Sequence, residues 1–171
     1  VPLAYRSKTL MVNMERYKWL PFIQQQDYIH INIPSYDLNF FHDGKSIKEM
    51  RVIVGTEFNP TPVFYGEVKC IITHPYWNIP GKIVKEEIIP SIKKDRRYLA
   101  KHHMEIIGKK GEIDPAFIRW KNYPRLRFPY KIRQRPGPDN ALGKIKFVFP
   151  NNYSIYLHDT PSKALFSEEH R

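Results

Sequence analysis

The stretch YSIYLHDTPSKALF, residues 153–166, combines a strand pattern with an abrupt stop directly after a histidine. Apolar and polar side chains alternate from Ile155 to His158, which predicts a half-buried β-strand that carries Tyr156 and His158 on one face. We expect the strand to stop at Asp159-Thr160-Pro161, because proline has no N–H for a strand ladder. The pattern therefore predicts a single histidine presented at the end of a strand.

Outward from this stretch, the same pattern predicts a mixed, β-dominated fold that is interrupted in its middle. The dipeptide Asp43-Gly44 between two β-rich runs is a strong hairpin signal. Strands are predicted at Tyr28–Ile33, Asp37–His42, Ser46–Val54, Glu67–Thr73, Tyr130–Gln134, Lys144–Phe149 and Tyr153–His158. Helical spacing predicts helices at Leu3–Trp19 with Ser7 as a cap, at Lys82–Ile89, at Lys94–Ile107, and from Asp114-Pro115 through Trp120.

Size and charge restrict the classes of function. The chain has 171 residues, of which 42% are hydrophobic, so we expect one folded domain over residues 1–171. The net charge is +11, but the sequence holds no zinc-finger spacing, RNA-binding strand motif or glycine-rich phosphate loop. We expect solvated basic faces that attract polyanions, and no nucleic-acid partner. No run of about 18 apolar residues is present, so no transmembrane segment is predicted.

Six blocks along the chain, in this order, resemble the catalytic domain of the larger periplasmic L,D-transpeptidases. They are residues 13–21 (NMERYKWLP), 51–55 (RVIVG), 60–64 (PTPVF), 75–80 (PYWNIP), 135–143 (RPGPDNALG) and 158–161 (HDTP). The resemblance implies a twisted β-sandwich of that type. It also implies that a helical insertion, at about 79–128, caps the active site, and we expect this block to behave as a lid. The fold would be incomplete at its C-terminus.

The resemblance further implies a cysteine peptidyltransferase that cross-links the stem peptides of peptidoglycan in the periplasm and that carbapenem-type β-lactams inhibit. His158 would be the general base, because a neutral imidazole can take a thiol proton and return it to a leaving amine. Trp77 and Tyr156 would line the peptide-binding cleft. In the family, the nucleophile belongs to a Ser-His-Gly-Cys motif about fifteen residues after this histidine, which would fall beyond Arg171. The chain by itself is therefore expected to be inactive, and no cofactor is implied.

Two other groups of reactive side chains in the sequence do not fit a catalytic or metal site, and two other classes of function stay open. Cys70 and His74 would lie about 13 Å apart on one strand, beyond hydrogen-bond reach, so Cys70 is interpreted as a buried sheet residue. His102-His103 has no zinc-site spacing, so no metal site is predicted. The alternatives in function are an L,D-carboxypeptidase or lipoprotein-anchoring relative with the same site, and a non-catalytic cell-wall-binding domain.

Overall fold

The structure is a computed structural model that describes residues 2–18, 27–123 and 128–169, and it divides into two compact units. The first unit combines Val1–Tyr65 with Lys163–Arg171, and the second is Gly66–Ser162. Helices and antiparallel sheets are both well represented, which confirms the predicted mixed, β-rich fold class. The prediction of one domain over residues 1–171 stays a prediction.

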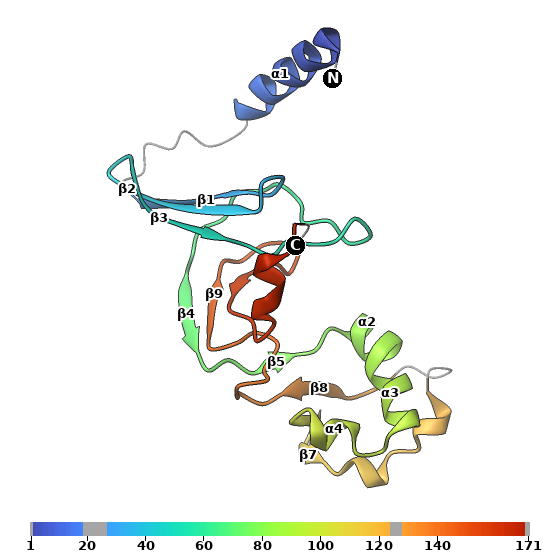
Figure 1. Cartoon of the computed structure of the whole chain (residues 1–171). Coiled ribbons are helices and arrows are strands. Elements are labelled where there is room, and N and C mark those ends of the chain that lie inside the picture. Colours follow the sequence, from blue (N-terminus) through green and yellow to red (C-terminus); the bar gives the residue numbers. More distant parts are fainter. Residues whose placement is uncertain (1, 19–26, 124–127, 170–171) are drawn as a thin grey trace. The chain divides into compact units, whose positions relative to one another are not determined.

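In the first unit, the described residues form an α-helix and a three-stranded antiparallel sheet (Figure 1). The helix α1 (Leu3–Tyr17) begins directly after Pro2 and has no side-chain cap, so the interpretation of Ser7 as its cap was wrong. Trp19 and Pro21, where this helix was expected to end, lie outside the described residues. The sheet has the order β1-β2-β3, with strands at Asp27–Asn32, Asp37–His42 and Lys45–Arg51. The short 3₁₀ helix η4 (Lys163–Ser167) completes this unit.

The hairpin between β2 and β3 confirms the prediction made from Asp43-Gly44. Both residues adopt the left-handed backbone conformation, with φ of 47° and 73°. Two consecutive residues with positive φ are what a two-residue type I′ turn requires, and glycine accepts that conformation without a steric penalty. The turn sets His42 opposite Lys45, so the local sequence alone fixes the register of this end of the sheet.

In the second unit, the strand predicted over Tyr153–His158 forms only at its end, because Leu157–His158 pairs in a sheet while residues 153–156 are not a strand and Ser154 has a φ of 57°. This short strand lies at one edge of a small antiparallel sheet. The sheet has the order β10-β9-β4, with strands at Leu157–His158, Ile145–Val148 and Cys70–Thr73. Across this sheet, His158 is the register partner of Lys146, and Lys146 is the partner of Ile72. Register partners in an antiparallel sheet point to the same face, so these three side chains share one face.

The other sheet of the second unit carries the main hydrophobic core. Its order is β5-β8-β6-β7, with strands at Trp77–Asn78, Lys131–Gln134, Met104–Gly108 and Gly111–Ile113. A continuous helical segment precedes it in the chain and consists of α2 (Gly81–Ile83), the π-helical turn η1 (Val84–Ile88) and α3 (Ile89–Lys94). The short helices α4 (Tyr98–Lys101), η2 (Pro115–Phe117) and η3 (Trp120–Asn122) follow. Ile106 and Ile132, paired between β6 and β8, are completely buried under this helical layer.

The segment expected to be a helical lid is partly strand. The predicted helix over Lys94–Ile107 is wrong beyond Lys101, because Met104–Gly108 forms strand β6 and pairs with β8. The segment also supplies most of the buried apolar cluster, and its behaviour as a lid stays a prediction. By contrast, Asp114 caps η2 as predicted, with its carboxylate accepting from the N–H of Ala116 at 2.8 Å.

Candidate active site

His158 stands at the end of β10 with its imidazole exposed and one ring nitrogen already engaged. Nδ1 lies 2.5 Å from the backbone oxygen of Asp159. A carbonyl oxygen can only accept, so Nδ1 carries the proton and donates it in this contact. The neutral ring then presents the unprotonated Nε2 as an acceptor, and this tautomer is the one that a general base requires. The structure thus orients the imidazole through a backbone carbonyl and not through the Asp159 carboxylate.

The Asp159 carboxylate points away from the ring and toward the loop before β9. It accepts from the N–H of Lys144 at 3.1 Å. Gly143 passes close beside it, since a Cβ atom on Gly143 would lie 2.5 Å from Asp159 Oδ2. The turn after His158 takes its cap from Thr160, whose hydroxyl accepts from the N–H of Ser162 at 3.1 Å. Asp159 therefore ties the histidine turn to the loop at 135–143.

Two aromatic side chains connect the histidine to the second sheet. The rings of Tyr156 and His158 lie with centroids 5.7 Å apart, on the shared face of β10 and the residues before it. The indole of Trp77, on β5, donates a hydrogen bond to Tyr156. Burial raises the pKa of Tyr156 above its ordinary value, and the bond from Trp77 opposes that rise. The phenol therefore stays protonated at neutral pH, and the structure brings all three predicted site residues into one row.

A cavity of about 320 Å³ lies in the second unit beside this row. It is lined by residues of the helices, of the sheet β5-β8-β6-β7, of the loop at 135–143 and of the turn after His158: Trp77, Ile83, Glu87, Ile88, Tyr98, His102, Met104, Gln134, Asp139, Ala141, Thr160, Pro161 and Ser162. Trp77 thus lies both at the cavity and at Tyr156. His102 lines the cavity and packs on Tyr98 with ring centroids 4.2 Å apart. Its neighbour His103 has a φ of 53°, and the described residues hold no cluster suited to a metal ion.

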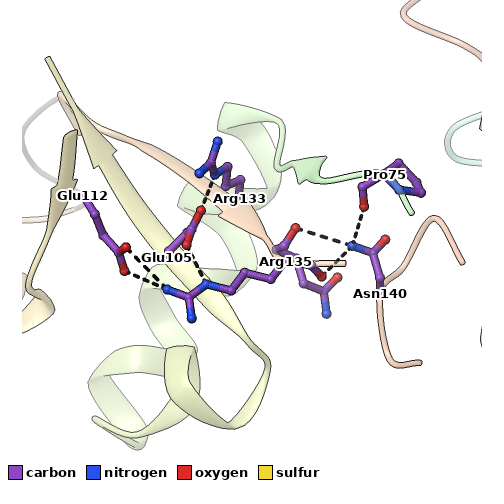
Figure 2. A network of polar contacts seen from close by, with 7 residues as sticks. Pro75, Glu105, Glu112, Arg133, Arg135 and Asn140 are labelled. Atoms are coloured by element: carbon purple, nitrogen blue, oxygen red, sulfur yellow. Dashed lines mark hydrogen bonds and ion pairs between the residues drawn. The ribbon is translucent and has the colours of Figure 1, made fainter. Parts of the chain in front are cut away.

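An ion-pair network centred on the buried Glu105 joins β6 and β8 (Figure 2). Glu105 has a side chain only 4% exposed and pairs with both Arg133 and Arg135. Its Oε2 accepts from Nε of Arg135 at 2.6 Å, and Arg135 continues to Glu112 at 3.1 Å. Burial alone would raise the pKa of Glu105, but the hydrogen bonds from the two arginines outweigh it and hold that pKa below its ordinary value. Glu105 is therefore a carboxylate at neutral pH, and its ion pairs with Arg133 and Arg135 connect β6 to β8 and the residue that follows it.

Asn140 fastens the loop at 135–143 to the segment that leads into Trp77. It is 1% exposed, and its Nδ2 donates to the backbone oxygens of Pro75 at 3.1 Å and Arg135 at 2.9 Å, as Figure 2 shows. Its Oδ1 accepts from the N–H of Leu142 at 2.8 Å. The sequence reasoning missed this residue, although a Pro-Gly-Pro-Asp-Asn turn with a polar side chain is a signal for side-chain bonding to backbone.

The only cysteine is not part of the row that ends at His158. Cys70 lies on β4 and is exposed, so the interpretation of a buried sheet cysteine was wrong. Its register partner is Val148, whereas the position opposite His158 on β4 is Ile72. Two strand spacings of roughly 10 Å in total, and about 7 Å along the strand, therefore separate Cys70 from His158. Direct proton transfer between them is excluded by this separation.

Comparison with known proteins identifies the family of the chain. The model of the L,D-transpeptidase catalytic domain matches residues 26–171, which is most of the chain. The chain belongs to this family. A protein of Haemophilus influenzae that carries the name "Putative L,D-transpeptidase" is 39% identical over 166 residues. That alignment covers 96% of this chain and 33% of the relative, so the chain spans about a third of the relative's length. No helix in the described ranges has the length and apolar character that crossing a membrane needs.

Proposed function

We propose that this chain contributes the general base and part of the peptide cleft of a peptidoglycan L,D-transpeptidase of the bacterial periplasm. Membership of the L,D-transpeptidase family supports the class of reaction. The observation that carries the assignment of roles is the contact of His158 Nδ1 with the oxygen of Asp159, which leaves Nε2 free to accept a proton. The cavity beside Trp77 and Thr160 supplies a cleft for an extended peptide.

In the proposed reaction, a cysteine thiol transfers its proton to Nε2 of His158 while its sulfur attacks a peptide carbonyl. The substrate is a tetrapeptide stem, and the attacked carbonyl belongs to its third residue. The imidazolium then returns the proton to the nitrogen of the departing D-alanine, and a thioester remains. An amine of a second stem then attacks the thioester and gives a proton to His158. The amide bond that forms is the cross-link, and the cysteine leaves as a thiolate that takes the proton back from His158.

The nucleophile in this proposal is a cysteine beyond Arg171, in the motif that the resemblance implies. Cys70 does not fit the role, because Lys146 on β9 stands between its strand and that of His158. We therefore propose that the 171 residues alone form no acyl-enzyme. Carbapenem-type β-lactams, which acylate the same kind of thiol, would inhibit the whole enzyme.

The test uses the whole enzyme with tetrapeptide stems, and mass spectrometry follows release of D-alanine and formation of the cross-linked dimer. His158→Ala should lower the rate by about 10²-fold or more, which is the usual scale for loss of a general base. His30→Ala is the matched control, because His30 lies on β1 with its side chain exposed, and it should leave the rate unchanged. A His158→Ala enzyme with the wild-type rate would refute the assignment.

The identity of the acyl acceptor follows from the products of the same assay. An amine acceptor gives a cross-linked dimer, water gives a free tripeptide, and a protein lysine gives a peptide-modified protein. We propose the amine of a second stem as the acceptor. Free tripeptide as the sole product would contradict cross-linking and would favour the carboxypeptidase alternative, while leaving the role of His158 intact.

A further inference from the structure

Lys146 is held directly beside His158 on the same face of the sheet. The two residues are register partners between β9 and β10, which brings Cβ atoms to within about 5 Å of each other. The lysine is also fixed in orientation, because its Nζ lies over the ring of Tyr156, 3.6 Å from the ring centroid. Tyr156 in turn takes the hydrogen bond from Trp77. A positive charge therefore stands at a defined place in the row of site residues.

No carboxylate of the described residues neutralises this charge. The cations of Lys101, Arg133 and Arg135 all have ion-pair partners within the second unit, whereas Lys146 has an aromatic ring as its neighbour. Lys146 is partly buried, and burial lowers its pKa, whereas negative charge on the sulfur of Cys70 would oppose that shift. A partly buried cation without an anionic partner is costly, and an anion from a ligand would relieve that cost.

We propose that Lys146 binds the C-terminal carboxylate of the peptide donor, namely that of the residue whose amine departs. The proposal rests on the proposed function, because the reacting bond must lie at Nε2 of His158. In a peptide, the carboxylate of the last residue lies one Cα away from the nitrogen of the last peptide bond. With the nitrogen of that bond at His158, the carboxylate comes to the neighbouring strand, where Lys146 presents three N–H donors on a flexible stem.

Lys146 would therefore determine specificity for a donor that ends one residue after the reacting bond. A longer donor has an uncharged amide in place of that carboxylate and forgoes the charge-assisted hydrogen bond. Loss of a hydrogen bond to a charged group commonly lowers binding by about tenfold or more. The alternative is that Lys146 only packs on Tyr156, in which case the chemistry at the end of the donor would not matter.

The test compares two donors that differ only at the end: the tetrapeptide stem with a free carboxylate, and the same peptide with a C-terminal carboxamide. The rate constant kcat/KM for acylation is measured with the whole enzyme. The wild type should prefer the acid by about tenfold or more. Lys146→Met should reduce that preference to about twofold or less, whereas Lys146→Arg, which keeps the charge, should retain most of it. Lys131→Met, on the exposed side of β8, removes an equal charge and should leave the preference unchanged.

Each result has a definite meaning. A preference for the acid that survives in Lys146→Met overturns the proposal, and so does a wild type that does not distinguish acid from amide. An equal loss of rate on both donors in Lys146→Met shows a purely structural role and also overturns it. Absence of acylation with either donor in the wild type would instead refute the proposed function itself, and the role of Lys146 with it.

Discussion

Asn140→Ala should destabilise the second unit more than its single buried amide suggests. The substitution removes the hydrogen bonds donated to the oxygens of Pro75 and Arg135, a longer one to the oxygen of Gln134 at 3.4 Å, and one accepted bond from the N–H of Leu142. Asn140 is 1% exposed and Leu142 is 3% exposed, so water cannot readily replace the lost partners. With about 1 kcal/mol for each bond, and more where a buried group is left unsatisfied, the loss should be roughly 3 kcal/mol.

The assay is thermal denaturation followed by the fluorescence of the tryptophans, Trp77 and Trp120 among them, at neutral pH. In a protein of this size, 3 kcal/mol corresponds to a decrease in Tm of roughly 6–12 °C. Asn122→Ala is the control, because Asn122 is exposed at the end of η3 and should change stability by less than about 0.5 kcal/mol.

A second variant separates the hydrogen bonds that the Asn140 side chain donates from the one that it accepts. Asn140→Asp keeps an oxygen for the N–H of Leu142 but loses both donors and places a carboxylate against two backbone oxygens. It should therefore be at least as destabilising as Asn140→Ala at neutral pH. If Asn140→Ala changes stability no more than Asn122→Ala, the inference that the buried hydrogen bonds of Asn140 stabilise the second unit is refuted.

Three further predictions test other parts of the second unit. Gly143→Ala should cost about 1–2 kcal/mol from backbone strain alone, since Gly143 has a φ of 60°, and it should also slow acylation by displacing Asp159; an unchanged denaturation midpoint would contradict this. Glu105 has a depressed pKa in the folded state, so its contribution to stability is complete above the ordinary value of 4.5 and is lost as pH falls through the lower folded value. The wild type should therefore lose stability, seen as a lower denaturation midpoint, when the pH is taken below about 4.5, and Glu105→Gln should lose less. Midpoints that fall in parallel with pH in the two proteins would count against the pairing of Glu105 with the arginines. In hydrogen exchange, the amides of Ile106 and Ile132 should be protected more strongly than that of Ile31 on β1, because they lie in the buried cluster. Weaker protection of Ile106 and Ile132 than of Ile31 would contradict this expectation and would support the lid interpretation of residues 79–128.

The features that the sequence predicted well are those fixed by neighbouring residues. The hairpin at Asp43-Gly44 needs only two residues with positive φ, and the cap at Asp114 needs only the N–H two residues on. The end of the strand at His158 follows from alternation and a proline, both local signals, although only the last two of the predicted strand residues pair. Local patterns could therefore place the histidine at the end of a strand, whereas its proposed role as general base comes from the family resemblance.

The features that the sequence missed depend on partners far along the chain. Met104–Gly108 has apolar side chains at spacings that fit a helix, but it pairs with β8 some 28 residues later, and that pairing outweighs local propensity. The burial of Glu105 could not be predicted either, because a glutamate is buried only when its partners are in place, here Arg133 and Arg135. The same holds for Lys146, whose position beside His158 is a matter of strand register.

The most direct test of the central claim, that His158 activates a cysteine other than Cys70, is to locate a carbapenem adduct. The whole enzyme is treated with a carbapenem at neutral pH, digested and mapped by mass spectrometry. Cys70→Ser should form the adduct at the wild-type rate, and His158→Ala should form it about 10²-fold more slowly or worse. The adduct should map to a cysteine beyond Arg171. An adduct on Cys70, or one that forms equally fast without His158, would contradict the account.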